Sequence, residues 1–202
     1  MKIKILDSEP MISIMWNPET AEHPRSPGLH LTDIIYPMMK ELGETPERPD
    51  LTTKDLEGYR SIGFLWERIL TDALTRKAAA DKLANGGDWQ LFRPGEIEFE
   101  SIYMTPDAAI VSFDDMVLEE WKATYTSSKR PIENKKQWWI QIMAYLKGLG
   151  LTKATIRVLH VCGNWSPPIP CIRIYQATFN QREIDENWNA VKNYGRKLGL
   201  LS

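Results

Sequence analysis

The sequence predicts a mixed α/β fold in which helices flank a central mixed sheet. Segments with apolar residues at helical spacing alternate with short, β-branched apolar segments, and these two patterns are typical of helices and strands. Their order along the chain is helix, three strands, helix, two strands, helix. An apolar fraction of 43% in 202 residues is enough for a core. We therefore expect one domain, residues 51–202, preceded by an N-terminal extension, residues 1–50, whose helix packs on the core.

The N-terminal half of the chain is expected to be mainly helical. Residues 1–30 contain several prolines and are predicted to be irregular. Thr32 is suited to cap a helix that runs to Leu42. Apolar residues at helical spacing predict a long helix from about Thr53 to Leu83, which Gly86 and Gly87 end.

The second half is expected to carry the strands. Three strands come first, and Asp114-Asp115 forms a tight turn between the last two. A polar, basic loop follows, then a helix that ends at Gly148 and Gly150, a second hairpin and a final amphipathic helix. The predicted ranges, in this order, are 97–103, 108–113, 117–123, 125–136, 136–149, 153–162, 171–179 and 181–198.

Charged residues on the first predicted hairpin indicate a chemical site. With Asp114-Asp115 as the turn, Asp107 would lie opposite Lys122, and Ala109 opposite Glu120. Paired residues share a face and side chains alternate along a strand, so Asp107, Glu120 and Lys122 would share one face and Glu119 would point to the other. Charges on a sheet covered on both faces are costly unless they are paired or bound to a metal. Two carboxylates and a lysine suit a divalent ion and an activated water, and the alternative is an ion pair between Lys122 and Asp107.

Composition excludes several other classes of protein. The formal net charge is −2, so the chain is not a basic coat for nucleic acid. We find no apolar run long enough for a membrane helix and no signal-peptide core near the N-terminus. Cys162 and Cys171 make neither a disulfide framework nor a zinc site and are expected to be free thiols in a reducing cytoplasm. His23, His30 and His160 lack metal-ligand spacing.

Four short motifs in order resemble one enzyme family. Thr105-Pro106-Asp107 followed by Glu120-Trp121-Lys122 is similar to the signature of PD-(D/E)xK nucleases. Gln141 and Tyr145 resemble the Q-x-x-x-Y motif of the RecB-like and lambda-exonuclease-like branch. Gly63 to Glu67 resembles the first core helix of that branch, which carries a glutamate. The resemblance covers about residues 55–180 and implies a restriction-endonuclease-like αβββαβ core, with 51–202 as the nuclease domain.

The resemblance also implies roles for these residues. Asp107 and Glu120 would bind one or two Mg²⁺ or Mn²⁺ ions, together with the backbone carbonyl of Trp121. Glu67 would be an additional ligand; otherwise it is an exposed helix glutamate paired with Arg68 or another cation. Lys122 would orient the attacking water and stabilise negative charge. No iron–sulfur cysteine set accompanies the motifs.

Several residues are candidates for DNA contact. Gln141 and Tyr145 share a helix face and would either touch DNA or hold the catalytic strand. The loop residues Ser127, Ser128, Lys129 and Arg130 would hold phosphates, or they form a solvated loop. Arg25 and Thr32 precede the first helix and would bind a terminal phosphate there.

The function implied is metal-dependent hydrolysis of DNA by an exonuclease of phage recombination or DNA processing. The expected location is the cytoplasm, which is the host cytoplasm if the protein is phage-encoded. A structure-selective endonuclease and a non-catalytic DNA-binding module that keeps the fold are the alternatives. The intact acidic residues and lysine favour catalysis, because buried charges have no use in a module that only binds. A homo-oligomer and a single-strand annealing partner are further expectations from the resemblance.

Overall fold

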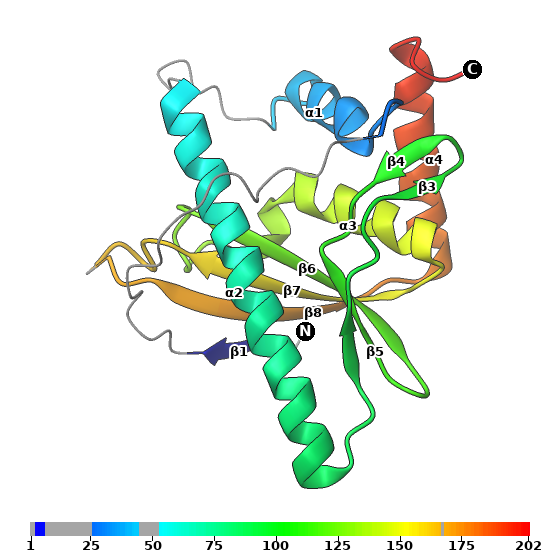
Figure 1. Ribbon diagram of the computed structural model, residues 1–202. Coiled ribbons are helices and arrows are strands. Elements are labelled where there is room, and N and C mark those ends of the chain that lie inside the picture. Colours follow the sequence, from blue (N-terminus) through cyan, green and yellow to red (C-terminus); the bar gives the residue numbers. More distant parts are fainter. Residues whose placement is uncertain (1–2, 7–25, 45–52, 167) are drawn as a thin grey trace.

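A sheet with helices on both faces forms the centre of the molecule. The computed structural model describes residues 3–6, 26–44, 53–166 and 168–202 (Figure 1). In this part of the chain, six strands form one sheet in which parallel and antiparallel pairs are mixed. The structure therefore confirms the mixed α/β class and the central mixed sheet.

The sheet has the strand order β1-β8-β7-β6-β5-β2. Neighbouring strands pair antiparallel except β6 and β7, which are parallel. A parallel pair needs a long crossover connection, and helix α3 provides it between these two strands. The strands are β1 (Ile3–Leu6), β2 (Gln90–Phe92), β5 (Ala108–Val111), β6 (Met116–Thr124), β7 (Lys153–His160) and β8 (Cys171–Thr178).

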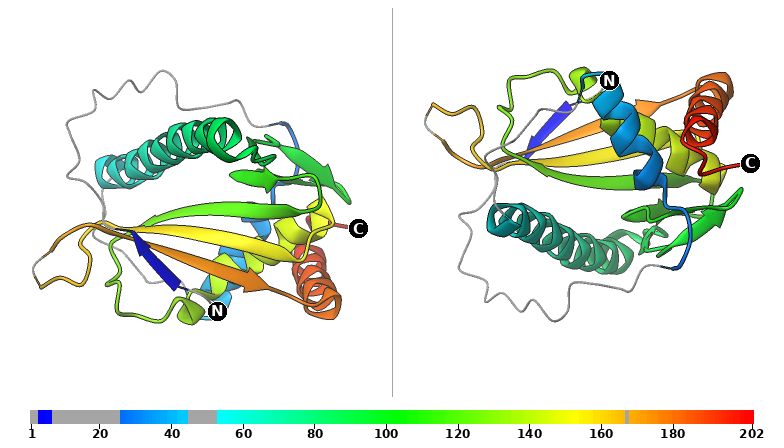
Figure 2. Two further views of the ribbon diagram at one scale, coloured as in Figure 1. Left: turned by 90° about the horizontal axis from the view of Figure 1, so that it is seen from below. Right: turned by 90° about the horizontal axis from the view of Figure 1, so that it is seen from above.

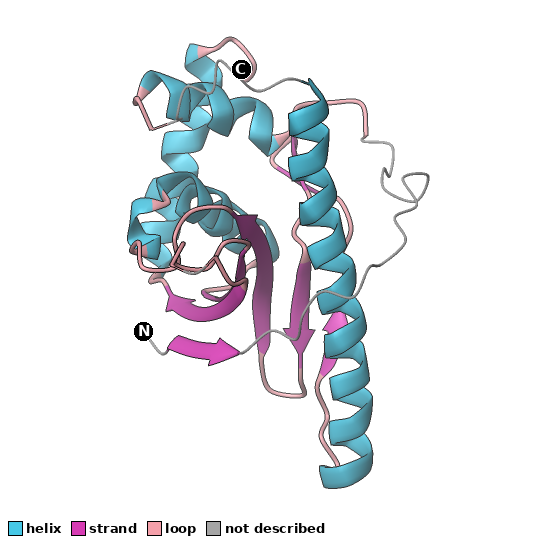
Figure 3. Ribbon diagram, turned by 90° about the vertical axis from the view of Figure 1, so that its left-hand side faces the viewer, coloured by secondary structure: helices cyan, strands magenta, loops and turns pink. Residues whose placement is uncertain are grey.

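The helices divide between the two faces. Helix α2 covers one face, and α1, α3 and α4 lie on the other (Figure 2). Figure 3 shows α2 as a long, separate helix alongside the sheet. None of the helices in the described ranges is long and apolar enough to span a membrane. The helices are α1 (Leu31–Glu41), α2 (Thr53–Asn85), α3 (Lys136–Leu149) and α4 (Gln181–Lys197), and a short 3-10 helix, Ile132–Asn134, precedes α3.

Strand β6 contributes to the apolar packing on both faces because its side chains alternate. Leu118 joins the larger core, in which Ile142 and Leu146 of α3 are fully buried. Trp121 points to the other face and packs with Trp66 and other residues of α2. The strand is therefore held between two helical layers, and polar groups on it are largely removed from water.

One predicted strand is wrong. Residues 97–103 form a hairpin, β3 (Ile97–Phe99) and β4 (Ile102–Met104), which makes a separate two-stranded sheet. Glu100 and Ser101 form its two-residue turn with φ of 48° and 64°. Such turns usually contain asparagine or glycine, so this turn gave no sequence signal.

The hairpin also explains Gly148, which was expected to help end α3 but lies within it. A Cβ at Gly148 would lie 2.5 Å from the Met104 side chain of the hairpin, so the glycine permits close packing there. Helix α3 ends at Gly150 instead, whose φ of 68° allows the left-handed cap.

The N-terminal predictions need two corrections. Ile3–Leu6, within the segment expected to be irregular, forms β1 and pairs with β8. Thr32 is not the cap of α1 but lies in its first turn, and His30 occupies the cap position. The carboxylate of Asp33 accepts the backbone N–H of His30 at 3.0 Å, which satisfies that end of the helix.

The register of the β5–β6 hairpin differs from the predicted one by two residues. Ala108 pairs with Glu119 and Ala109 with Leu118, so Asp107 comes next to Glu120 rather than opposite Lys122. The turn is longer than Asp114-Asp115 and includes Phe113, whose side chain is 92% exposed. A shift of two residues preserves the face of every side chain, whereas a shift of one would reverse it.

Candidate active site

Asp107 immediately precedes β5, and its carboxylate extends the pairing with β6. Its Oδ2 accepts the backbone N–H of Trp121 at 2.6 Å, two residues past Glu119, the last β6 residue that pairs with β5. The N–H and C=O of one residue point to the same edge of a strand. The Trp121 carbonyl is therefore directed to the edge at which Asp107 lies.

Glu120 and Lys122 lie on the α3 face of β6. The Lys122 ammonium donates to Glu120 Oε1 at 2.5 Å, and the Glu120 side chain is only 1% exposed. The second oxygen, Oε2, is buried and has no hydrogen-bond partner among the described residues. A buried carboxylate oxygen without a partner is costly. Next to a second carboxylate, it fits a hard divalent cation, which prefers oxygen ligands.

Burial and neighbouring charges shift the pKa values of Asp107, Glu120 and Lys122. Burial and the neighbouring Asp107 carboxylate raise the pKa of Glu120 to about 8. Burial also raises the pKa of Asp107. For Lys122, burial lowers the pKa but the Glu120 and Asp107 carboxylates raise it by more, so the net shift is upward. A divalent ion would therefore compete with protons for the carboxylates near neutral pH.

The raised pKa of Glu120 predicts how stability without metal depends on pH. The folded protein binds the proton more tightly than the unfolded chain, so stability falls as pH rises from the unfolded value of 4.5 to about 8. Glu120→Gln removes this dependence. As pH rises, we expect the free energy of unfolding of the variant to increase relative to that of the parent. The expected difference is about 1 kcal/mol per pH unit, roughly 2–4 °C in Tm. Thermal unfolding in EDTA between about pH 5.5 and pH 7.5 measures it.

Glu186→Gln is the matched control, because Glu186 lies in an exposed pair with Arg182 on α4. Its unfolding curve should run parallel to that of the parent at every pH. If the stability of Glu120→Gln instead changes with pH as that of the parent does, Glu120 does not have a raised pKa and the assignment of a buried acid is wrong.

Gln141 and Tyr145 of α3 complete the contacts of Lys122. Lys122 Nζ also donates to Gln141 Oε1 at 3.0 Å, and Gln141 Nε2 donates to the Tyr145 hydroxyl at 2.7 Å. Tyr145 is buried, and burial raises the pKa of its hydroxyl well above the usual value. Of the two roles expected for this pair, these contacts correspond to holding strand β6 through Lys122.

Glu67 approaches the site from α2, and its partner is Arg93 rather than Arg68. The Arg93 guanidinium lies 3.2 Å from the Glu67 carboxylate. Burial and the Asp107 carboxylate raise the pKa of Glu67 to about 7. Within the described ranges, no three histidine, cysteine or acidic side chains are grouped closely enough to hold an ion. Asp107, Glu120 and Glu67 thus do not form a ligand set by themselves in this conformation.

Two arginines near the site were not selected from the sequence. Arg93 follows β2 in a loop without a recognisable motif, and Arg157 lies in β7. Arg157 donates to both oxygens of Glu119, at 2.7 and 2.9 Å, on the α2 face of the sheet. The buried Glu119 also accepts the indole N–H of Trp121 at 3.2 Å. The two adjacent glutamates of β6 therefore have separate partners on opposite faces.

The predicted DNA-binding loop is partly tied to the protein. The buried Ser128 donates its backbone N–H to Gly163 O at 2.7 Å, and Ser127 Oγ accepts the N–H of Lys129 at 3.3 Å. Lys129 and Arg130 are exposed. Thr32 lies in α1, and Arg25 is outside the described residues. The structure thus leaves the two cations of this loop accessible to a polyanion.

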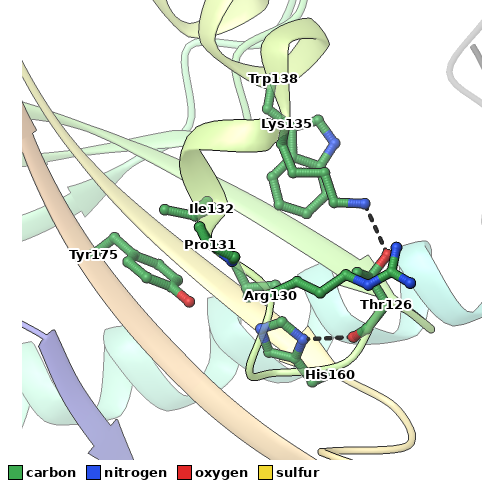
Figure 4. Close-up of a pocket in the computed structure, with 9 residues that line it drawn as sticks. Thr126, Arg130, Pro131, Ile132, Lys135, Trp138, His160 and Tyr175 are labelled. Carbon is green, nitrogen blue, oxygen red and sulfur yellow. Dashed lines mark hydrogen bonds between the residues drawn. The ribbon is translucent and has the colours of Figure 1, made fainter. Parts of the chain in front are cut away.

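Arg130 also borders a small cavity between this loop and β7 (Figure 4). His160 lines it, and its Nδ1 lies 2.9 Å from Thr126 O, while Nε2 has no partner among the described residues. Burial lowers the pKa of His160. The cavity volume of about 10 Å³ is enough for about one water molecule. A nucleotide does not fit in a cavity of this volume.

Comparison with solved structures finds exonucleases at low sequence identity and with TM-scores below 0.5. No family model matches the chain, and no curated protein matches it. The alkaline exonuclease LHK-Exo from Laribacter hongkongensis, in complex with dAMP, is 13% identical with a TM-score of 0.48, over 85% of this chain and 88% of that one. A phage-related exonuclease from Haemophilus somnus 129PT is 13% identical with a TM-score of 0.38, over 85% and 94% of the two chains.

Proposed function

We propose that this protein is a metal-dependent deoxyribonuclease that hydrolyses phosphodiester bonds from the ends of duplex DNA. One observation carries the proposal. Asp107, Glu120 and Lys122 meet on one face of the central sheet, and Glu120 Oε2 is buried there without a partner among the described residues. Such a combination of buried acids and a lysine is suited to binding a cation and a polyanionic substrate.

Asp107 and Glu120 would hold one or two Mg²⁺ or Mn²⁺ ions, with the Trp121 carbonyl at the same edge and Glu67 reached directly or through water. When bound, the ion would activate water and neutralise the negative charge that develops on the phosphate. The protein positions the carboxylates and sets the pH range in which they bind the ion. Asp107 is fixed by the Trp121 N–H, and the raised pKa of Glu120 makes ion binding stronger as pH rises to about 8.

Lys122 would act on the attacking water and the phosphate. Its ammonium carries three N–H donors, and two of them are used by Glu120 and Gln141. The third has no acceptor among the described residues and would orient the water or donate to a phosphate oxygen. Donors that are already fixed before the substrate binds stabilise the transition state without reorganisation. Tyr145 supports this arrangement by holding Gln141.

DNA binding would rest on local cations, since the net charge of the chain is −2. The exposed Lys129 and Arg130 follow the catalytic strand and are suited to phosphate contact. Action at DNA ends, a role in phage recombination, a homo-oligomer and a single-strand annealing partner are supported by the Q-x-x-x-Y resemblance alone.

Cleavage of defined substrates tests the proposal. The protein is incubated with end-labelled linear duplex, single-stranded and covalently closed circular DNA, in Mg²⁺, Mn²⁺ or EDTA. Glu120→Gln is the inactive variant and Glu186→Gln the control. We expect metal-dependent loss of linear duplex, absent in Glu120→Gln, with circles spared. Cutting of circles would show an endonuclease. Failure of the folded protein to cut any substrate would contradict catalysis and favour a binding module.

A further inference from the structure

Arg93 connects three parts of the molecule at the edge of the candidate site. It follows β2, and its side chain reaches α2 and the residue that precedes β5. Nε donates to the Asp107 backbone carbonyl at 3.0 Å, Nη1 to Thr71 Oγ1 at 3.2 Å and Nη2 to Glu67 Oε2 at 3.2 Å. The guanidinium also lies over the Trp121 ring, 5.6 Å from its centroid.

These contacts differ from an ordinary surface ion pair. The Arg93 side chain is 45% exposed, and a single pair at such a position contributes little to stability. Here, however, each of the three guanidinium nitrogens has its own acceptor. The acceptors are also fixed: Thr71 gives its hydroxyl proton to the Glu67 carbonyl at 2.8 Å, which leaves its oxygen to accept from Arg93. The planar guanidinium of Arg93 therefore fixes the relative positions of its three acceptors more than it adds to the stability of the fold.

We propose that Arg93 is a positioning residue that fixes Glu67 and Asp107 relative to each other for metal binding. This inference rests on the proposed function. One side chain joins the carboxylate of Glu67, the main chain of Asp107 and the ring of Trp121. All three residues are among those assigned to the ion. Three of its five N–H donors go to these protein acceptors, and the role assigned to Arg93 is to act through them.

Variants of Arg93 test this role, with metal binding as a readout separate from cleavage. Mn²⁺ affinity is measured by titration calorimetry without DNA, and kcat and KM are measured on linear duplex. We expect Arg93→Ala to weaken Mn²⁺ binding by about 10-fold and to lower kcat at fixed Mn²⁺ by about 10- to 100-fold, with little change in KM for DNA. Guanidinium ions added to Arg93→Ala should restore part of both losses.

Two further variants make the test specific. Arg93→Lys keeps the charge, but one ammonium cannot reach three acceptors in different directions, so it should resemble Arg93→Ala. Arg76→Ala removes the same charge from α2 and should behave as the parent protein, because Arg76 donates to the backbone of its own helix, at Asp72 O. Circular dichroism and Tm report whether each variant is folded.

The outcomes separate this inference from the proposed function. Unchanged Mn²⁺ affinity in folded Arg93→Ala overturns the inference, as does a higher KM with kcat preserved, which would place Arg93 on the DNA. If the parent protein binds Mn²⁺ but cuts no DNA, the proposed function fails, and the affinities of the variants still decide the role of Arg93. If the parent binds no Mn²⁺, both proposals fail.

Discussion

Lys122→Met is expected to lower cleavage of linear duplex DNA by about 1,000-fold, the loss typical of removing a fixed donor that also assists proton transfer. Methionine keeps most of the length and the apolar stem of lysine, and it removes the ammonium that contacts Glu120 and Gln141. On the proposed mechanism, the attacking water and the phosphate would then lose their donor. Single-turnover kinetics with saturating enzyme measure the chemical step directly.

Loss of the ammonium has a second effect that the assay must separate. Lys122 lowers the pKa of Glu120, so the variant holds the Glu120 proton more tightly and binds metal less well at neutral pH. The comparison is therefore made at saturating Mg²⁺ and about pH 9. Lys153→Met is the control, because Lys153 pairs with Asp115 at the far end of β6. A Lys122→Met protein with full activity would leave Lys122 as an ion-pair partner only.

Arg157→Leu is expected to destabilise the protein by about 3–5 kcal/mol. The substitution leaves the Glu119 carboxylate, which is 1% exposed, without the guanidinium that contacts both of its oxygens. A buried charge that loses its partner carries its full desolvation cost. Urea unfolding at neutral pH measures the free energy of unfolding, and the slope of the transition tests whether the variant remains two-state.

A double variant shows whether the unpaired charge is the cause. Glu119→Gln/Arg157→Leu removes the charge and keeps an acceptor for the Trp121 indole N–H, which Glu119 accepts in the parent. We expect it to recover most of the lost stability. Arg182→Leu breaks an exposed pair on α4 and should cost less than about 1 kcal/mol. A loss of that small size in Arg157→Leu would mean that water reaches Glu119.

The arrangement of side chains on β6 followed from the sequence even though the register did not. The assumed turn at Asp114-Asp115 was too short, which displaced the pairing by two residues. The period of a strand is also two, so Glu120 and Lys122 still shared a face and Glu119 pointed away. A shift of two residues leaves the face of each side chain unchanged, but it changes the residue with which each one pairs.

Other features carried no local signal. The turn at Glu100-Ser101 adopts left-handed φ without glycine or asparagine, so the β3–β4 hairpin looked like one strand. Arg93 and Arg157 are ordinary residues in sequence, and their importance comes from partners far along the chain. Arg157 and Glu119 are 38 positions apart, and Arg93 and Glu67 are 26 apart. Such pairs appear only when the strands and α2 are assembled.

The short outer strand β2 has a consequence for solubility. It ends the sheet on one side with the three residues Gln90–Phe92, and Pro94 follows almost at once. A brief outer strand next to a proline offers few free main-chain groups on which another chain could add a strand, which limits aggregation. The same interruption places Arg93 at the point where pairing stops. Lengthening β2 would therefore expose an edge strand with unpaired main-chain groups, and it would move Arg93 away from Glu67.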